Sequence, residues 1–185
     1  MMYLSKAPVD RKLTLSGVDK CLGARQQRGL YVVEFAIVGG IFFLVLFAVI
    51  EVGRLLFTWN ILADVTRRAA RIAAVCPVNH SGIAPVAIYN GPTGTGASPI
   101  INGLTTGQLK ISYLDADGVE LGDPAGIPNY FLIEYVKAEI DPDSPYQHEL
   151  LIPGFWQTID APAFATVLPR ESLGVPREDV PASCF

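Results

Sequence analysis

One segment limits the folds open to this chain more than any other, the apolar run at residues 30–50. Its sequence, LYVVEFAIVGGIFFLVLFAVI, contains a single charged residue, Glu34, in twenty-one positions. As an α-helix the run would be about 31 Å long, close to the thickness of the hydrocarbon core of a bilayer. No A-x-A cleavage site follows the run, which argues against a cleaved secretory signal. The run therefore predicts one membrane-spanning helix, retained in the mature protein, rather than a buried helix of a soluble domain.

The charges on the two sides of this run have opposite signs. Residues 1–29 hold six basic and two acidic side chains (6 − 2 = +4), whereas residues 77–185 hold four basic and thirteen acidic ones (4 − 13 = −9). Basic flanking segments stay in the cytoplasm, so we predict a cytoplasmic N-terminus and a C-terminal part on the other side of the membrane. The acidic C-terminal part also excludes a basic surface for nucleic acid there.

A helical pattern continues beyond the apolar run. No proline occurs from residue 51 to residue 76, and apolar residues recur at steps of three, four and seven. The predicted apolar face comprises Leu55, Leu62, Val65, Ala69, Ile72 and Cys76, and the opposite face carries Asp64, Arg67, Arg68 and Arg71. We therefore predict one long helix over 30–76, with a transmembrane first half, an amphipathic second half and a stop at Pro77. Gly39, Gly40 and Gly53 are candidate points of bending.

The composition changes at Pro77, because thirteen of the fourteen prolines lie from there onward. Segment 109–121, LKISYLDADGVEL, predicts a strand, an Asp-Gly turn and a second strand, and 130–140, YFLIEYVKAEI, predicts another strand. The expected fold class is α+β, a long helix followed by a small, β-rich and loop-rich domain over 77–185. We refer to residues 77–185 as the C-terminal domain.

No motif in the chain predicts catalysis, a metal site or a cofactor. The glycine-rich GPTGTG at 91–96 lacks the lysine of a phosphate-binding loop, and DADG at 115–118 lacks the later ligands of a calcium loop. His80 and His148 fall in separate segments without acids or cysteines at ligand spacing, so we predict two exposed loop histidines. No serine lies in a G-x-S-x-G setting. We expect a protein that is not an enzyme.

The start of the helix, RGLYVVEF at 28–35, resembles the processing site of type IV pilin-like proteins. The continuation, with VEFAIV, EVGR at 51–54 and AARIA at 69–73, resembles the TadE-like pseudopilins of the tight-adherence (Flp) pilus system. The terminal ATVLPRESLG at 165–174 is similar to the end of that family's outer domain. The resemblance implies that prepilin peptidase cleaves between Gly29 and Leu30, removes the basic leader 1–29 and leaves Glu34 as the fifth residue.

The resemblance also implies a role for the acid in the membrane. In a bundle of pilin-like helices Glu34 can face the new α-amine of a neighbour, and a misaligned neighbour would leave the acid unpaired, so the pair would set the register. A tolerated acid that reaches the headgroups is the alternative. Glu51 and Arg54 are further candidate assembly residues. The expected partners are prepilin peptidase, other pseudopilins, the Flp-type pilin, the inner-membrane assembly platform and membrane lipid.

The resulting hypothesis is a minor pilin-like subunit for a pilus of surface adherence or secretion, in the inner (cytoplasmic) membrane with its C-terminal domain in the periplasm. The alternative is a single-pass anchored protein whose periplasmic domain binds a ligand or an envelope partner. Cys21 would leave with the leader, and Cys76 and Cys184 would remain in an oxidising compartment. We predict a Cys76–Cys184 disulfide, with a buried free Cys76 as the alternative.

Overall fold

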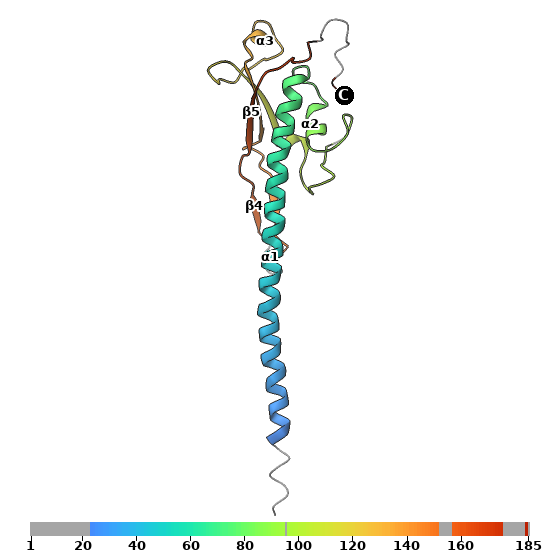
Figure 1. The fold of residues 1–185 in the computed structure, drawn as a ribbon, viewed down its shortest axis with the longest axis vertical. Coiled ribbons are helices and arrows are strands. Elements are labelled where there is room, and N and C mark those ends of the chain that lie inside the picture. The colour runs from blue at the N-terminus through green and yellow to red at the C-terminus, as the bar shows by residue number, and fades with distance from the viewer. Residues whose placement is uncertain (1–22, 95, 152–156, 176–183, 185) are drawn as a thin grey trace, which may run out of the picture. The chain divides into compact units, whose positions relative to one another are not determined.

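The structure is a computed structural model that describes residues 23–94, 96–151, 157–175 and 184. It has the predicted α+β architecture, with one long helix, α1 (Gly23–Val75), followed by a small strand-rich part (Figure 1). The chain divides into two compact units, Met1–Phe47 and Ala48–Phe185. Helix α1 begins seven residues before the predicted start at residue 30 and passes through Gly39, Gly40 and Gly53 without a break in its helical structure.

Within the first unit, the described side chains from Leu30 to Phe47 are exposed, apart from glycines. The segment Gly29–Val75 is the one helix among the described residues that is long and apolar enough to cross a membrane, with a mean hydropathy of 2.7 in its most apolar window. That window buries none of its surface inside the protein. An apolar surface of this size needs a cover other than water, so the sequence prediction of a single membrane span agrees with the helix.

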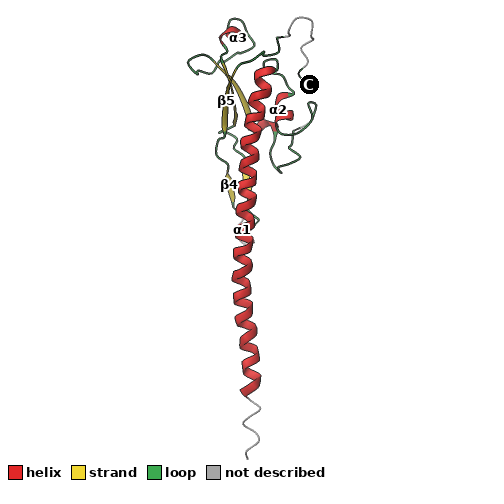
Figure 2. Ribbon diagram, in the orientation of Figure 1, coloured by secondary structure: helices red, strands yellow, loops and turns green. Residues whose placement is uncertain are grey.

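The second unit contains two small antiparallel sheets (Figure 2). The larger has the order β1-β2-β5, from β1 (Leu109–Leu114), β2 (Tyr135–Ile140) and β5 (Ala165–Pro169). In its register Ala138 on the central strand lies opposite Ile111 on β1 and Thr166 on β5. The smaller sheet pairs β3 (Gln147–Glu149) with β4 (Thr158–Asp160). Two short helical segments, α2 (Ile83–Ala87) and η1 (Thr106–Gln108), lie between α1 and β1, and α3 (Asn129–Leu132) lies between β1 and β2.

The core of the second unit lies between α1 and the three-stranded sheet. The predicted apolar face of the helix is the buried one, since Leu62, Val65 and Ala69 are completely inaccessible to solvent. They pack in one cluster with Ala138 and Ile140 of β2, and a second cluster joins the last turn of α1 to the other end of the sheet. The apolar face that recurs every 3.6 residues along the helix thus packs against the face of strand β2 that carries every second residue.

Two strand predictions are wrong in part. The segment 130–140 does not form one strand, because residues 130–132 belong to α3 and β2 starts at Tyr135. The second arm of the predicted 109–121 hairpin contributes a single bridge, between Leu114 and Glu120. The predicted Asp-Gly turn does form. The Asp115 carboxylate accepts a hydrogen bond from the backbone N–H of Val119 at 2.8 Å, and Gly118 has a positive φ of 80°. Strand β1 pairs along its whole length with β2, which carries more β-branched and apolar residues than the 119–121 arm.

Candidate functional site

The predicted processing residues, Gly29 and Leu30, lie on α1. A Cβ placed on Gly29 would have open space around it, so the fold of the described residues does not require glycine at this position. Leu30 and Glu34 are both exposed on the same helix. Packing among the described residues therefore does not explain glycine at position 29 or an acid at position 34.

Glu51, which is buried, and Arg54, which is partly exposed, form the centre of a polar cluster further along α1. Arg54 Nη1 donates to both carboxylate oxygens of Glu51 at 2.8 Å, across one turn of the helix. The backbone N–H of Leu151 donates to Oε1 of the same carboxylate at 3.3 Å. Only 6 % of Glu51 is exposed, although a carboxylate at the surface would be solvated at no cost. The carboxylate therefore joins α1 to the chain that follows strand β3.

His148 completes this cluster, and its predicted place in an exposed loop is wrong. It lies on β3, is 2 % exposed, and points Nε2 toward Glu51 Oε1 at 3.4 Å, in a direction that does not make a hydrogen bond. A two-residue alternation in the sequence could have indicated this burial, since Tyr146 and His148 alternate with the polar Gln147 and Glu149. In the structure the first two are buried and the other two are exposed. His80 is exposed as predicted, and its Nδ1 accepts from the N–H of Gly82 at 3.1 Å.

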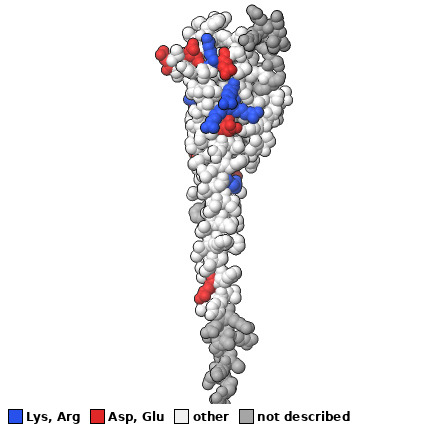
Figure 3. Space-filling model, viewed as in Figure 1, with Lys and Arg blue, Asp and Glu red and all other residues white. Residues whose placement is uncertain are grey.

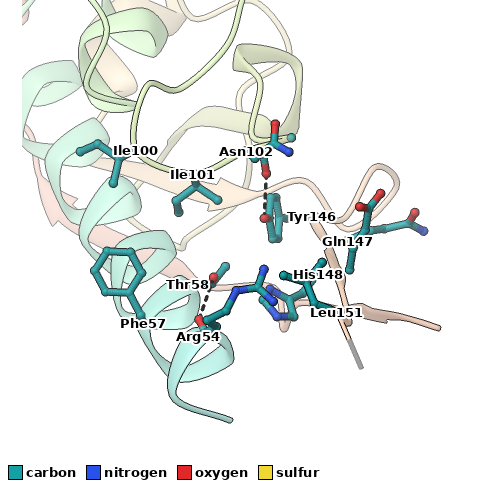
Figure 4. Close-up of a pocket in the computed structure, with 12 residues that line it drawn as sticks. Arg54, Phe57, Thr58, Ile100, Ile101, Asn102, Tyr146, Gln147, His148 and Leu151 are labelled. Carbon is teal, nitrogen blue, oxygen red and sulfur yellow. Dashed lines mark hydrogen bonds between the residues drawn. The ribbon is translucent and has the colours of Figure 1, made fainter. Parts of the chain in front are cut away.

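A cavity of about 380 Å³ opens beside the cluster (Figure 4). Its walls include Arg54, Phe57 and Thr58 of α1 together with Tyr146 and His148. The hydroxyls are already engaged, since Thr58 donates to the carbonyl of Arg54 at 3.0 Å and Tyr146 to that of Asn102 at 2.9 Å. Among the described residues no group of three or more His, Cys, Asp or Glu side chains is placed to hold a metal ion. The arrangement fastens α1 to the segment that contains strand β3 and Leu151.

The polar face of α1 carries a second cluster, around Tyr89. The Tyr89 hydroxyl donates to the carboxylate of Asp64, and the guanidinium carbon of Arg68 lies 4.9 Å from the centre of the Tyr89 ring. The hydrogen bond to Asp64 and partial burial raise the pKa of Tyr89. Asp64, Arg67, Arg68 and Arg71 are exposed, as the periodicity predicted, and Figure 3 shows basic side chains gathered on this part of the surface.

The end of α1 is held by the chain terminus. Cys76 and Cys184 form a disulfide with their Cα atoms 5.4 Å apart and 108 residues apart in sequence, the pair that the compartment argument predicted. The last carbonyls of the helix are also satisfied, because the N–H groups of Glu171 and Gly174 donate to Ala74 and Val75 at 3.1 and 2.7 Å. Gly174 has φ +77°, and a Cβ there would stand 2.7 Å from the nitrogen of Pro77, so glycine is required.

Comparison with known proteins adds one result. No curated protein and no solved structure matched this chain. One family model did match, over a segment that contains Gly29, Leu30, Glu34, Glu51 and Arg54. Residues 29–71 fit the family described as TadE-like protein, which confirms the resemblance to that family over this part of the chain.

Proposed function

We propose that this protein is a pseudopilin, a minor pilin-like subunit that acts without enzymatic activity in the assembly of a tight-adherence (Flp) pilus. It is anchored in the inner membrane by residues 30–50, with its N-terminus in the cytoplasm and its C-terminal domain in the periplasm. Prepilin peptidase removes the leader 1–29. The processed helix then packs against other pseudopilins, the Flp-type pilin and the inner-membrane assembly platform.

The observation that carries this proposal is the combination of family match and exposure. The matched segment 29–71 includes an apolar stretch of helix that the other described residues do not cover. Lipid covers such a helix in the membrane, and in a filament outside the membrane other apolar helices must replace the lipid. A helix with an uncovered apolar surface and a processing sequence at its start suits a subunit that moves from lipid into a helical bundle.

Glu34 supplies register in this scheme. It is exposed on α1, among apolar neighbours that give it no partner within the described protein. Ionised carboxylates inside a bilayer cost several kcal/mol, and pairing with the α-amine of a neighbouring subunit removes most of that penalty. Glu51 and Arg54 contribute differently. Because they already bind each other, we propose that they act in assembly by fixing the base of the C-terminal domain to the helix.

Processing is tested by N-terminal sequencing of protein extracted from membranes of a strain that makes prepilin peptidase. The mature chain should begin at Leu30. Gly29→Val should block cleavage, because a branched side chain at the cleavage site crowds the peptidase. Gly40→Val is the matched control, since both glycines lie on α1 with open space around them, and it should be cleaved normally. An intact leader in the unaltered protein would overturn the proposal.

Assembly is tested with Glu34→Ala. The variant should insert and be processed normally, because loss of a charge eases insertion by about 2.5–3.5 kcal/mol on insertion scales. Pilus formation and surface adherence should nevertheless be lost. The experiment requires a strain in which the unaltered protein is needed for pili. Normal pili with Glu34→Ala would contradict the register role, and normal pili with the gene deleted would favour the anchored binding protein instead.

A further inference from the structure

We propose that the surface where α1 meets the base of the C-terminal domain binds the lipid surface directly, as a second membrane contact beside the spanning segment. The contact consists of four exposed apolar side chains, which we call the collar: Val52, Leu56, Phe57 and Leu151. The inference rests on the proposed function only in taking residues 30–50 as a membrane span. It adds a lipid-binding surface shared by α1 and the C-terminal domain, which neither the family match nor the processing sequence implies.

The position of the collar follows from one hydrogen bond. Leu151 is tied by its N–H to Glu51, and Glu51 is the first residue after the apolar run. Because the run is as long as the hydrocarbon core is thick, residue 51 lies at the boundary between acyl chains and headgroups. Phe57, the collar residue farthest along the helix, is seven residues beyond residue 50, which corresponds to about 10.5 Å of helix. Apolar faces that bind membrane interfaces lie about 5–10 Å into the boundary between headgroups and acyl chains, and helical side chains lean back toward the N-terminus, so the collar reaches this layer.

The exposure of the collar calls for an apolar cover. Leu151 is 65 % exposed, and the three helix residues are each at least half exposed, on the same unit that buries Leu62 and Val65 completely. Phe57 and Leu151 come from different elements yet line the same cavity, with Arg54 between them in Figure 4. An apolar surface built from two elements is a feature of the folded domain and does not follow from the helix alone.

The charges beside the collar match a lipid interface. Arg54 is paired with Glu51 through two hydrogen bonds, so the pair carries no net charge into the headgroup layer. The Arg54 side chain is 40 % exposed and can reach phosphate while its stem covers apolar surface. Among the described residues that line the cavity beside the collar, Arg54 is the one Lys or Arg, and it is paired with Glu51, so binding depends on apolar burial. We therefore commit to a zwitterionic lipid surface as the partner, with no requirement for anionic lipid.

A second contact has a mechanical consequence. A domain attached by one helix can tilt against the membrane plane, whereas a domain that also inserts Leu151 is held at a defined tilt. An adjacent pilin-like helix could cover the collar instead, and the experiment below separates the two occupants by dilution.

The test uses the full processed chain with its disulfide intact, reconstituted into phosphatidylcholine vesicles at a low ratio of protein to lipid. Single cysteines carry an environment-sensitive fluorophore, and lipids brominated near the headgroup end of their acyl chains quench it. The labelled positions are Leu151→Cys in the collar, Val45→Cys in the span as a positive control, Asp117→Cys in the β1 turn as a negative control, and Glu149→Cys on β3 as a matched neighbour.

We expect quenching at position 151 to reach at least about half of that at position 45, less at 149 and none at 117. The result at 151 should not change when the vesicles are diluted in lipid or when anionic lipid is added. Quenching at 45 without quenching at 151 would overturn the lipid contact and leave the membrane anchor intact. Quenching at neither position would overturn both. An apolar environment reported by the fluorophore at position 151 that is lost when the protein is diluted in lipid would show that another helix, and not lipid, covers the collar.

Discussion

The two halves of helix α1 have the same backbone geometry and opposite relations to the rest of the molecule. Residues 30–50 are exposed on every side, whereas residues 51–75 bury one face against the sheet and expose the other. The first half is apolar all round, and the second half alternates apolar and charged residues with the helical period. A helix segment with an apolar stripe can be satisfied by its own domain, but one that is apolar all round needs lipid or other subunits.

The difference also appears in the two acids at the starts of the halves. Glu34 has no partner among the described residues near it, whereas Glu51 is held by Arg54 and by the N–H of Leu151. An acid in lipid therefore depends on another molecule, and an acid at the base of the domain is compensated locally. Substitutions in the second half should change the stability of the domain, and those in the first half should change association. The following experiments test that division.

The largest effect is expected from removal of the disulfide. Cys76→Ser with Cys184→Ser opens a loop of about 108 residues, for which chain-entropy estimates give up to about 4.7 kcal/mol. Urea unfolding in detergent micelles, followed by near-ultraviolet circular dichroism, should show this loss in the domain, while the helicity of residues 30–50 persists. Before the substitution, neither thiol of the mature protein should react with a maleimide without reduction. Reaction of both thiols would exclude the bond.

The next effect concerns two leucines on α1. Leu62→Ala removes a side chain that is completely buried between the helix and the sheet, which should lower the free energy of unfolding by about 2–5 kcal/mol. Leu56→Ala is the matched control, because Leu56 lies less than two turns away and is half exposed. It should change the same quantity by less than about 0.5 kcal/mol. Equal losses in both variants would mean that the division of α1 into two faces is wrong.

The two acids provide an intermediate test. Glu51→Gln leaves Arg54 without its counter-ion and weakens the acceptor for Leu151, so the domain should lose about 1–3 kcal/mol of unfolding free energy. Glu34→Gln should leave urea unfolding of the domain unchanged, because Glu34 is exposed and remote in sequence from the core. In cells, by contrast, Glu34→Gln should abolish pilus formation, although it leaves the stability of the domain unchanged. A destabilised domain with Glu34→Gln would contradict the separation.

The smallest effect is expected at Tyr89, and it depends on pH. The hydrogen bond to Asp64 and partial burial raise the pKa of Tyr89, so the folded state favours the neutral phenol. Its contribution to stability is therefore complete below the ordinary tyrosine pKa of about 10, and is lost as the pH rises through the higher folded value. Tyr89→Phe should cost about 0.5–1 kcal/mol at pH 7. It should also flatten the loss of stability between neutral and alkaline pH relative to the unaltered protein, and an unchanged pH profile would contradict the assignment.

Much of the long helix was predictable from the sequence. The apolar run, the buried face at Leu62, Val65 and Ala69, and the exposed arginines all follow from local periodicity, which depends only on helix geometry. The Asp-Gly turn at 115–118 was predictable for the same reason, because Asp115 bonds the backbone of its own turn. The predictions failed where a residue's environment comes from distant parts of the chain, as for His148 and for the start of strand β2.

The sequence by itself determined a helix long and apolar enough to span a membrane, its change of character at residue 51, and the segment 29–71 that matches the TadE-like family. Only the tertiary structure decided that Glu51 is buried against β3, that Leu151 is fastened one residue beyond the apolar run, and that the chain terminus caps α1 through Cys184 and the 171–174 segment. The reason is the range of the interactions. Helix period and hydropathy are sums over neighbours in sequence, whereas a buried carboxylate takes its partners from wherever the folded chain returns, here 100 residues later.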